Sequence, residues 1–164
     1  MTLIEIAQLL ENSEFGTALR ESQYMFPIVE GLHLLGLALS FGLIFFIDLR
    51  LLGIFLPEVP ISQILQQFRA CIFGGFIATF ISGVLLFWAE AAKMLANSGF
   101  QIKLLLMFFA LINALLFEIK CVRRGAKWLD QALEPLDIKF AACASLILWG
   151  GVTIFGRLTP YMSG

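Results

Sequence analysis

Residues 27–47 read PIVEGLHLLGLALSFGLIFFI, an apolar stretch long enough to cross a bilayer as a helix. Pro27 suits the first turn of a helix, and the charged residues Asp48 and Arg50 close the stretch at its other end. Three later stretches share this character, at about 70–89, 100–119 and 140–158. The sequence therefore predicts an all-α integral membrane protein built as a bundle of four transmembrane helices.

The composition agrees with a membrane protein. The 164 residues are 60% hydrophobic and 14% charged, with a mean hydropathy of +0.91, whereas soluble domains carry about 25% charged residues. Four spans of about 20 residues each leave too little chain for a second globular core. We therefore expect residues 1–164 to form a single transmembrane domain. The formal net charge of −1 gives no indication of a nucleic-acid partner, so the expected partner is the lipid bilayer.

The segment before the first span, residues 1–24, has its own pattern. Leu3, Ile6 and Leu10 recur near helical spacing, with acidic residues between them. This pattern predicts a short amphipathic helix, either lying in the membrane interface or packed on the end of the bundle. Because the segment lacks a basic start and a continuous apolar run, we do not expect it to be a cleaved signal peptide.

Basic residues divide unevenly between the two ends of the predicted bundle. Seven of the eleven lie in or beside the 48–69 and 120–139 loops: Arg50, Arg69, Lys120, Arg123, Arg124, Lys127 and Lys139. The other four are Arg20, Lys93, Lys103 and Arg157. The positive-inside rule then predicts that the first end is cytoplasmic and that both termini are periplasmic. The single cysteines, at positions 71, 121 and 143, would lie toward the cytoplasm as reduced packing residues.

Small residues recur along the second span. One set repeats at four-residue spacing and a second set follows one residue later: Gly74, Ala78 and Ser82, then Gly75, Thr79 and Gly83. Gly150 and Gly151 form a similar surface on the fourth span. Such surfaces allow helices to approach closely, either within one bundle or between protomers of a homo-oligomer.

The chain has one histidine, His33, and it lies within the first span three residues after Glu30, on the same helix face. Ionisable groups are costly in hydrocarbon, so both residues are functional candidates, with a structural hydrogen bond as the alternative. Alternating helix directions bring further polar residues to the same end of the bundle, where an outward-facing pocket is expected: Trp88, Glu90, Lys103, Arg157 and Tyr161. For Lys103, Arg157 and Trp88, anchoring at the interface is the simpler reading.

Other polar residues are expected to join helices. At the basic end, Asp48 and Arg50 lie near the predicted helix end that carries Glu118 and Lys120, so ion pairs across helices are expected there. Asn113 lies deep in the third span and is expected to form an interhelical hydrogen bond.

The stretches 24–53, 100–118 and 146–161 resemble a family of small bacterial four-helix membrane proteins known only as a domain of unknown function. That resemblance implies the bacterial inner membrane and no particular activity. More distantly, the pattern from His33 to Gly42 and the FQIKLLL stretch around Lys103 are similar to copper-resistance D type proteins and to the haem-containing protoporphyrinogen oxidase family. This resemblance implies that His33 ligates haem, that Lys103 is functional, and that Arg50 is the arginine ending the same helix.

The leading hypothesis is a haem b-binding membrane protein with a redox or electron-transfer role and His33 as the metal ligand, with Glu30, Lys103 and Arg157 near the cofactor. Because no second histidine exists, a second axial ligand would come from another residue type or another protomer. A redox partner or quinone is then implied, although it stays open whether the chain is an enzyme. The alternatives are an oligomeric transporter or channel subunit using Glu30, His33 and Lys103, and a non-catalytic subunit of a membrane complex.

Overall fold

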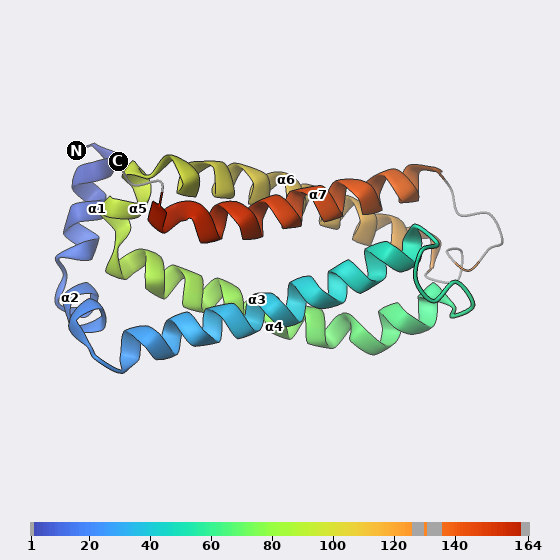
Figure 1. The fold of residues 1–164 in the computed structure, drawn as a ribbon, viewed down its shortest axis with the longest axis horizontal. Helices are drawn as coiled ribbons and strands as arrows, with labels where there is room; N and C mark the ends of the chain where they lie inside the picture. The colour runs from blue at the N-terminus through green and yellow to red at the C-terminus, as the bar shows by residue number, and fades with distance from the viewer. Residues whose placement is uncertain (1, 126–129, 131–135, 162–164) are drawn as a thin grey trace.

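The computed structural model describes residues 2–125, 130 and 136–161. Within these residues four helices are long and apolar enough to cross a membrane, which confirms the expected all-α membrane fold. They are α3 (Met25–Leu51), α4 (Ile61–Ala89), α6 (Ser98–Arg124) and α7 (Leu136–Leu158). Figure 1 shows them running along the long axis of the molecule, with successive helices in opposite directions.

The helices are longer than the apolar stretches that predicted them. The second was expected from about residue 70, but α4 begins at Ile61, directly after Pro60, and includes Gln63, Gln66 and Arg69. Its 29 residues correspond to roughly 44 Å of helix, against about 30 Å of hydrocarbon in a bilayer. The apolar pattern of the sequence marks only the part of each helix that lies in hydrocarbon. The helical backbone hydrogen bonds continue beyond that part.

The N-terminal segment forms two short helices where one was expected. They are α1 (Leu3–Glu11) and α2 (Glu14–Glu21), and both lie across the ends of the long helices (Figure 1). Thr2 and Glu5 form a capping box at the start of α1. Ser13 separates the two helices, because its hydroxyl accepts a hydrogen bond from Gly16 N and so caps the start of α2.

These two helices are held against the end of α4 and against α5 (Ala91–Ala96). The Trp88 indole donates a hydrogen bond of 3.0 Å to Ser13 Oγ. Glu11 accepts from Ala92 N at 2.9 Å and forms an ion pair of 3.1 Å with Arg20. The segment is therefore packed on the end of the bundle, and its position relative to the membrane interface stays a prediction.

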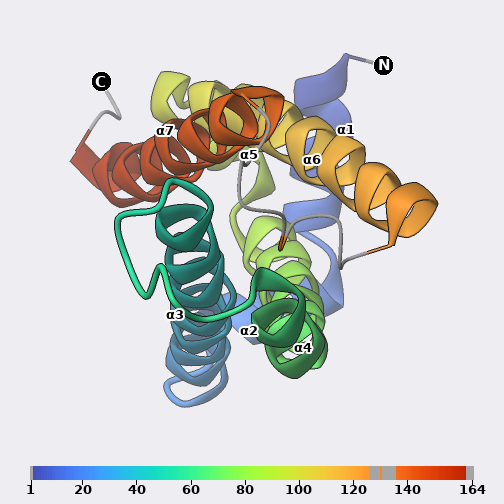
Figure 2. The same ribbon diagram turned by 90° about the vertical axis from the view of Figure 1, so that its right-hand side faces the viewer.

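The long helices form two hairpins, α3 with α4 and α6 with α7. Helix α3 also packs against α7, whereas α4 and α6 do not approach closely along the described part of the chain. Figure 2 shows this separation, with α4 below α6 on the right of the view. The bundle is therefore closed on the α3–α7 side and more open on the α4–α6 side.

Small residues explain the close contact between α3 and α4. Cβ atoms built on Gly36 or Gly75 would lie 3.0 Å from the carbonyl oxygen of the other glycine. Thr79 and Gly83 continue the same face of α4 toward α3, while a Cβ on Gly74 would meet nothing within 4 Å. The predicted small-residue surface thus joins helices within one chain through its second set, which begins at Gly75.

Apolar packing joins all four long helices near the end where α3 finishes and α7 begins. This cluster contains Ile47, Leu51, Ile61, Cys121, Ile138 and Ala142. A second cluster around Trp149 lies nearer the middle, where Phe76 of α4 approaches the indole with a centroid distance of 5.1 Å. Between these contacts lies the cavity described below.

Candidate functional site

The environment of His33 is set by α4. Its Nδ1 atom lies 3.0 Å from Thr79 O and 3.1 Å from Ser82 Oγ. A carbonyl oxygen can only accept a hydrogen bond, so the contact with Thr79 assigns the imidazole proton to Nδ1. In the neutral ring, Nε2 then carries the free lone pair.

Gly83 makes room for the histidine ring. A Cβ atom at this position would lie 3.1 Å from Cε1 and 3.4 Å from Nδ1 of His33. Any larger residue would push the half-buried imidazole away from the α4 backbone and lengthen its hydrogen bond to Thr79. The sequence marked Gly83 only as a small residue, and its role beside His33 depends on how the two helix faces meet.

Two of the other predicted site residues lie near His33. Lys103 of α6 and Glu30 of α3 are both close enough to contribute to the electrostatic environment of the imidazole. Lys103 is half-buried, and its Nζ lies 3.3 Å from where a Cβ on Gly156 of α7 would be. Glycine at position 156 therefore lets the lysine lie along α7. The structure brings Glu30, His33 and Lys103 together, from two different hairpins.

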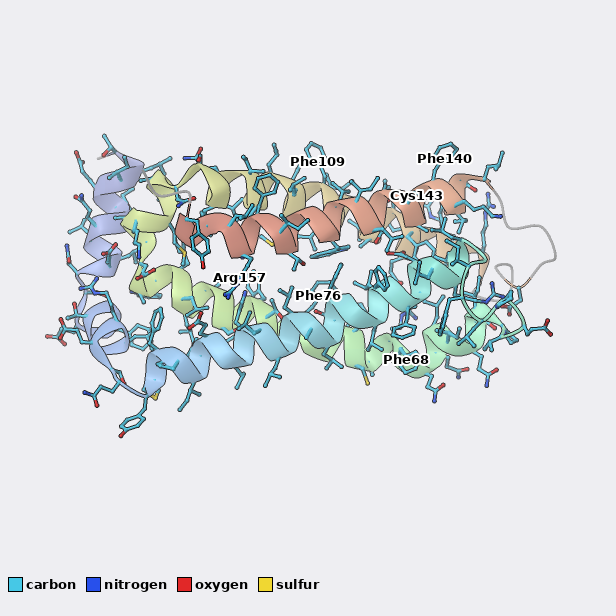
Figure 3. All side chains as sticks on the ribbon, in the orientation of Figure 1. Phe68, Phe76, Phe109, Phe140, Cys143 and Arg157 are labelled. Atoms are coloured by element: carbon cyan, nitrogen blue, oxygen red, sulfur yellow. The ribbon has the colours of Figure 1, made fainter. Side chains whose placement is uncertain are left out.

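The remaining predicted pocket residues take other positions. Arg157 is exposed, and Figure 3 shows its side chain extending from α7 toward the layer formed by α3 and α4. Trp88 is bonded to Ser13, and Glu90 forms an ion pair of 3.3 Å with Lys93, so both belong to the packed end of the bundle. Tyr161 is exposed within the short 3-10 helix Thr159–Tyr161.

Ion pairs across helices are present at the other end, as expected. Glu118 pairs with Arg69 of α4, and Lys120 pairs with Asp137 of α7 at 2.7 Å. Arg50 donates from Nε to Val59 O at 2.8 Å, within the turn after α3. Both acidic and basic residues of α6 therefore pair across helices, but with partners on α4 and α7.

The expected interhelical bond of Asn113 is present. Its Nδ2 donates to Ala141 O at 3.0 Å, which joins α6 to α7. A carbonyl can serve as this partner because small residues such as Ala141 leave it accessible in the helix interface. The prediction for Asn113 is confirmed.

A cavity of about 430 Å³ lies between the two hairpins, toward the end of α3. Its lining is mostly apolar and aromatic, and its polar residues are Asp48, Arg69, Asn113, Glu118 and Ser145. Phe76, which Figure 3 shows pointing from α4 toward α7, lies on its wall with Trp149. His33, Lys103 and Glu30 do not line it.

Asp48 is the most unusual residue of this cavity. Asp48 is only 5% exposed to solvent, and its carboxyl group interacts with the Ser145 hydroxyl of α7. Its Oδ2 atom has no hydrogen-bond partner among the residues that the structure describes. The sequence marked Asp48 only as the charged end of a span, because the burial depends on α7 packing over it.

The described residues contain no group of three or more histidine, cysteine or acidic side chains that could hold a metal ion. Cys71, Cys121 and Cys143 are free thiols that lie apart. A bare ion such as zinc needs three or four protein ligands, so it finds no site in this part of the chain. Lys127, one of the basic residues used to predict orientation, lies outside the described residues.

Comparison with known proteins gives a family and no activity. No curated protein and no solved structure matches the chain. Nothing found in these comparisons supports the more distant resemblance to copper-resistance D type or haem-containing oxidase proteins. A family model covers residues 23–162, which include all four long helices. The chain belongs to this family of unknown function, DUF6644.

Proposed function

We propose that the chain is a haem b-binding membrane protein in which Nε2 of His33 would ligate the iron. The observation that carries this proposal is the 3.0 Å hydrogen bond from His33 Nδ1 to the Thr79 carbonyl. Metal-ligating histidines usually donate their other ring N–H to a carbonyl or carboxylate, which fixes the tautomer and the ring orientation. His33 has this arrangement within a membrane span.

The donor set is compatible with haem more than with a bare metal ion. The porphyrin supplies four nitrogen ligands, so one histidine is enough to hold the iron from the protein side. The absence of a larger ligand cluster among the described residues therefore counts against zinc or copper and not against haem. Bound haem would supply one-electron redox chemistry.

Basic residues of α6 and α7 suit the carboxylate groups of haem. Lys103 contributes to the electrostatic environment of the His33 imidazole. Arg157 extends from α7 toward the layer formed by α3 and α4 (Figure 3). Either cation would pair with a haem propionate, since charge-assisted hydrogen bonds to carboxylates are strong where water is scarce. Glu30 would act on His33 through its charge.

The test is an absorption spectrum of protein purified in mild detergent from haem-replete cells. We expect a Soret band and, by pyridine haemochrome assay, one haem per chain. His33→Ala should lose the band, whereas Ser82→Ala should keep it, because the Thr79 carbonyl still accepts from Nδ1. A colourless wild-type protein, or a full Soret band in folded His33→Ala protein, would overturn the proposal.

A second candidate function is supported by the grouping of Glu30, His33 and Lys103. Three ionisable groups that interact electrostatically within membrane spans are typical of proton or ion pathways. Four long helices are few for a transporter, so this function implies a homo-oligomer. Proton flux into liposomes should then fall in Glu30→Gln and His33→Ala but not in Glu90→Gln, whose carboxylate pairs with Lys93. If all three variants carry the same proton flux as the wild type, the transport function is excluded.

We also infer that the protein lies in the bacterial inner membrane with the basic end in the cytoplasm. The ends of α3 and α6 and the starts of α4 and α7 share that end (Figure 1). It carries most of the chain's basic residues, and such an excess favours the cytoplasmic side. Alkaline phosphatase fused after residue 164 should be active, and a green fluorescent protein fused there should be dark. An inactive alkaline phosphatase fusion with a fluorescent green fluorescent protein fusion would show that the C-terminus is cytoplasmic and the topology is the opposite one.

A further inference from the structure

Among the residues that the structure describes, the cavity between the hairpins holds one buried acidic side chain, Asp48, with an oxygen atom that lacks a hydrogen-bond partner. Arg69 and Glu118 both line the cavity and pair with each other, so their charges offset. Asp48 interacts with the neutral Ser145 hydroxyl, and its Oδ2 has no partner among the described residues. A buried carboxylate oxygen without a hydrogen-bond partner is costly in a membrane protein, so a cationic ligand would stabilise this side chain.

The walls of the cavity suit the same kind of ligand. Aromatic rings from three helices face it: Phe73, Phe76, Phe80, Phe117 and Trp149. Aromatic faces attract organic cations through their negative π-surface. Aliphatic residues such as Ile44, Ile47 and Leu65 complete the lining and would hold an alkyl chain. The volume of about 430 Å³ lies in the range of pockets that hold small molecules.

A route into the cavity is present on the side where the backbones of α4 and α6 make no close contact along the described part of the chain. Lining residues on both helices are strongly exposed, among them Phe80 at 71% and Leu115 at 60%. These residues lie on membrane-spanning helices, so the exposed side faces lipid. A ligand dissolved in the bilayer could therefore reach Asp48 without crossing the head-group layer at the end of the bundle.

We propose that this cavity binds a lipophilic amine, with its ammonium group on the Asp48 carboxylate and its apolar part against the aromatic wall. The ammonium donates to the carboxylate, while the Arg69–Glu118 pair lines the same cavity. The site uses none of the residues around His33, so it stands whether or not the chain binds haem.

The test compares ligands that share one tail and differ in the head group. Full-length protein in lipid nanodiscs is titrated with radiolabelled decylamine, decanol or decanoate, and empty nanodiscs measure partition into lipid. We expect saturable binding of one decylamine per chain. Decanol should bind at least about tenfold more weakly, because a hydrogen bond to a charged group contributes more than a neutral one. Decanoate should not bind above the lipid background.

Two variants locate the binding. Asp48→Asn keeps the side-chain shape and removes the charge, so it should weaken decylamine binding at least about tenfold and leave decanol unchanged. Ala114→Phe fills the cavity while leaving Asp48 intact, and it should abolish saturable binding. Circular dichroism checks that each variant is folded. If Asp48→Asn does not fold, the head-group series on the unaltered chain decides.

Equal binding of decylamine and decanol by the wild type would overturn the proposal and favour a neutral lipid or quinol as occupant. Unchanged decylamine binding by folded Asp48→Asn or Ala114→Phe protein would also overturn it.

Discussion

Alanine at position 75 should destabilise the contact between α3 and α4, whereas alanine one residue earlier should not. A Cβ atom on Gly75 would lie 3.0 Å from Gly36 O, Ser40 N and Ser40 Cβ. Two of these are backbone atoms, so a change of side-chain rotamer cannot relieve the contact. Helix α3 would have to move until the distances reach the 3.4 Å of ordinary contact.

The size of the effect follows from two opposing contributions. Overpacking of this kind costs about 1–3 kcal/mol, while alanine in place of glycine stabilises a helix interior by about 1 kcal/mol. At Gly74 only the second contribution applies, because a Cβ there meets nothing within 4 Å. Gly75→Ala should therefore be about 2 kcal/mol less stable than Gly74→Ala.

The two variants add the same methyl group to the same helix, so each controls for the other. Their free energies of unfolding can be compared by titrating SDS into mixed micelles and following far-ultraviolet circular dichroism. Gly75→Ala should unfold at a lower SDS fraction than wild type, and Gly74→Ala at the same or a higher one. Coincident curves for the two variants would refute the close backbone contact between α3 and α4.

Three further predictions concern polar contacts elsewhere in the bundle. Asn113→Leu removes the bond to the α7 backbone and should lower the free energy of unfolding by about 1 kcal/mol, measured by the same titration; an unchanged midpoint would contradict it. Ser13→Ala removes both the cap of α2 and the acceptor for Trp88. Loss of about 1 kcal/mol should speed amide exchange in α2 about fivefold, and unchanged protection would count against the cap. A double-mutant cycle on Arg69 and Glu118 should give a coupling of no more than about 1 kcal/mol, because the side chains are 49% and 36% exposed; several kcal/mol would mean that lipid desolvates the pair.

The fold could be predicted from sequence because hydrocarbon imposes a simple length rule on apolar helices. The same rule says nothing about where a helix ends once it leaves the hydrocarbon, so the start of α4 at Ile61 was missed. The split of the N-terminal segment into α1 and α2 depends on one hydroxyl, that of Ser13. A hydrophobic pattern alone does not reveal such a cap.

The candidate site could be predicted only in part. His33 and Lys103 stood out because ionisable residues within apolar spans are rare. The carbonyl of Thr79 and the space at Gly83 and Gly156 could not be foreseen, because they depend on which helix faces meet. Asp48 was assigned to a helix end for the same reason, and only the packing of α7 over α3 explains its burial.

The hairpin arrangement also bears on how the protein is made. Most close contacts join helices that are neighbours in the chain, α3 with α4 and α6 with α7. Because the chain is made from its N-terminus and N-terminal segments can fold first, the first hairpin can complete its glycine contact before α6 has been synthesised. Helices α1 and α2 can dock on its end as soon as Trp88 and Ala92 emerge. The meeting of α3 with α7 then joins two finished halves, so separately expressed halves should assemble in one membrane.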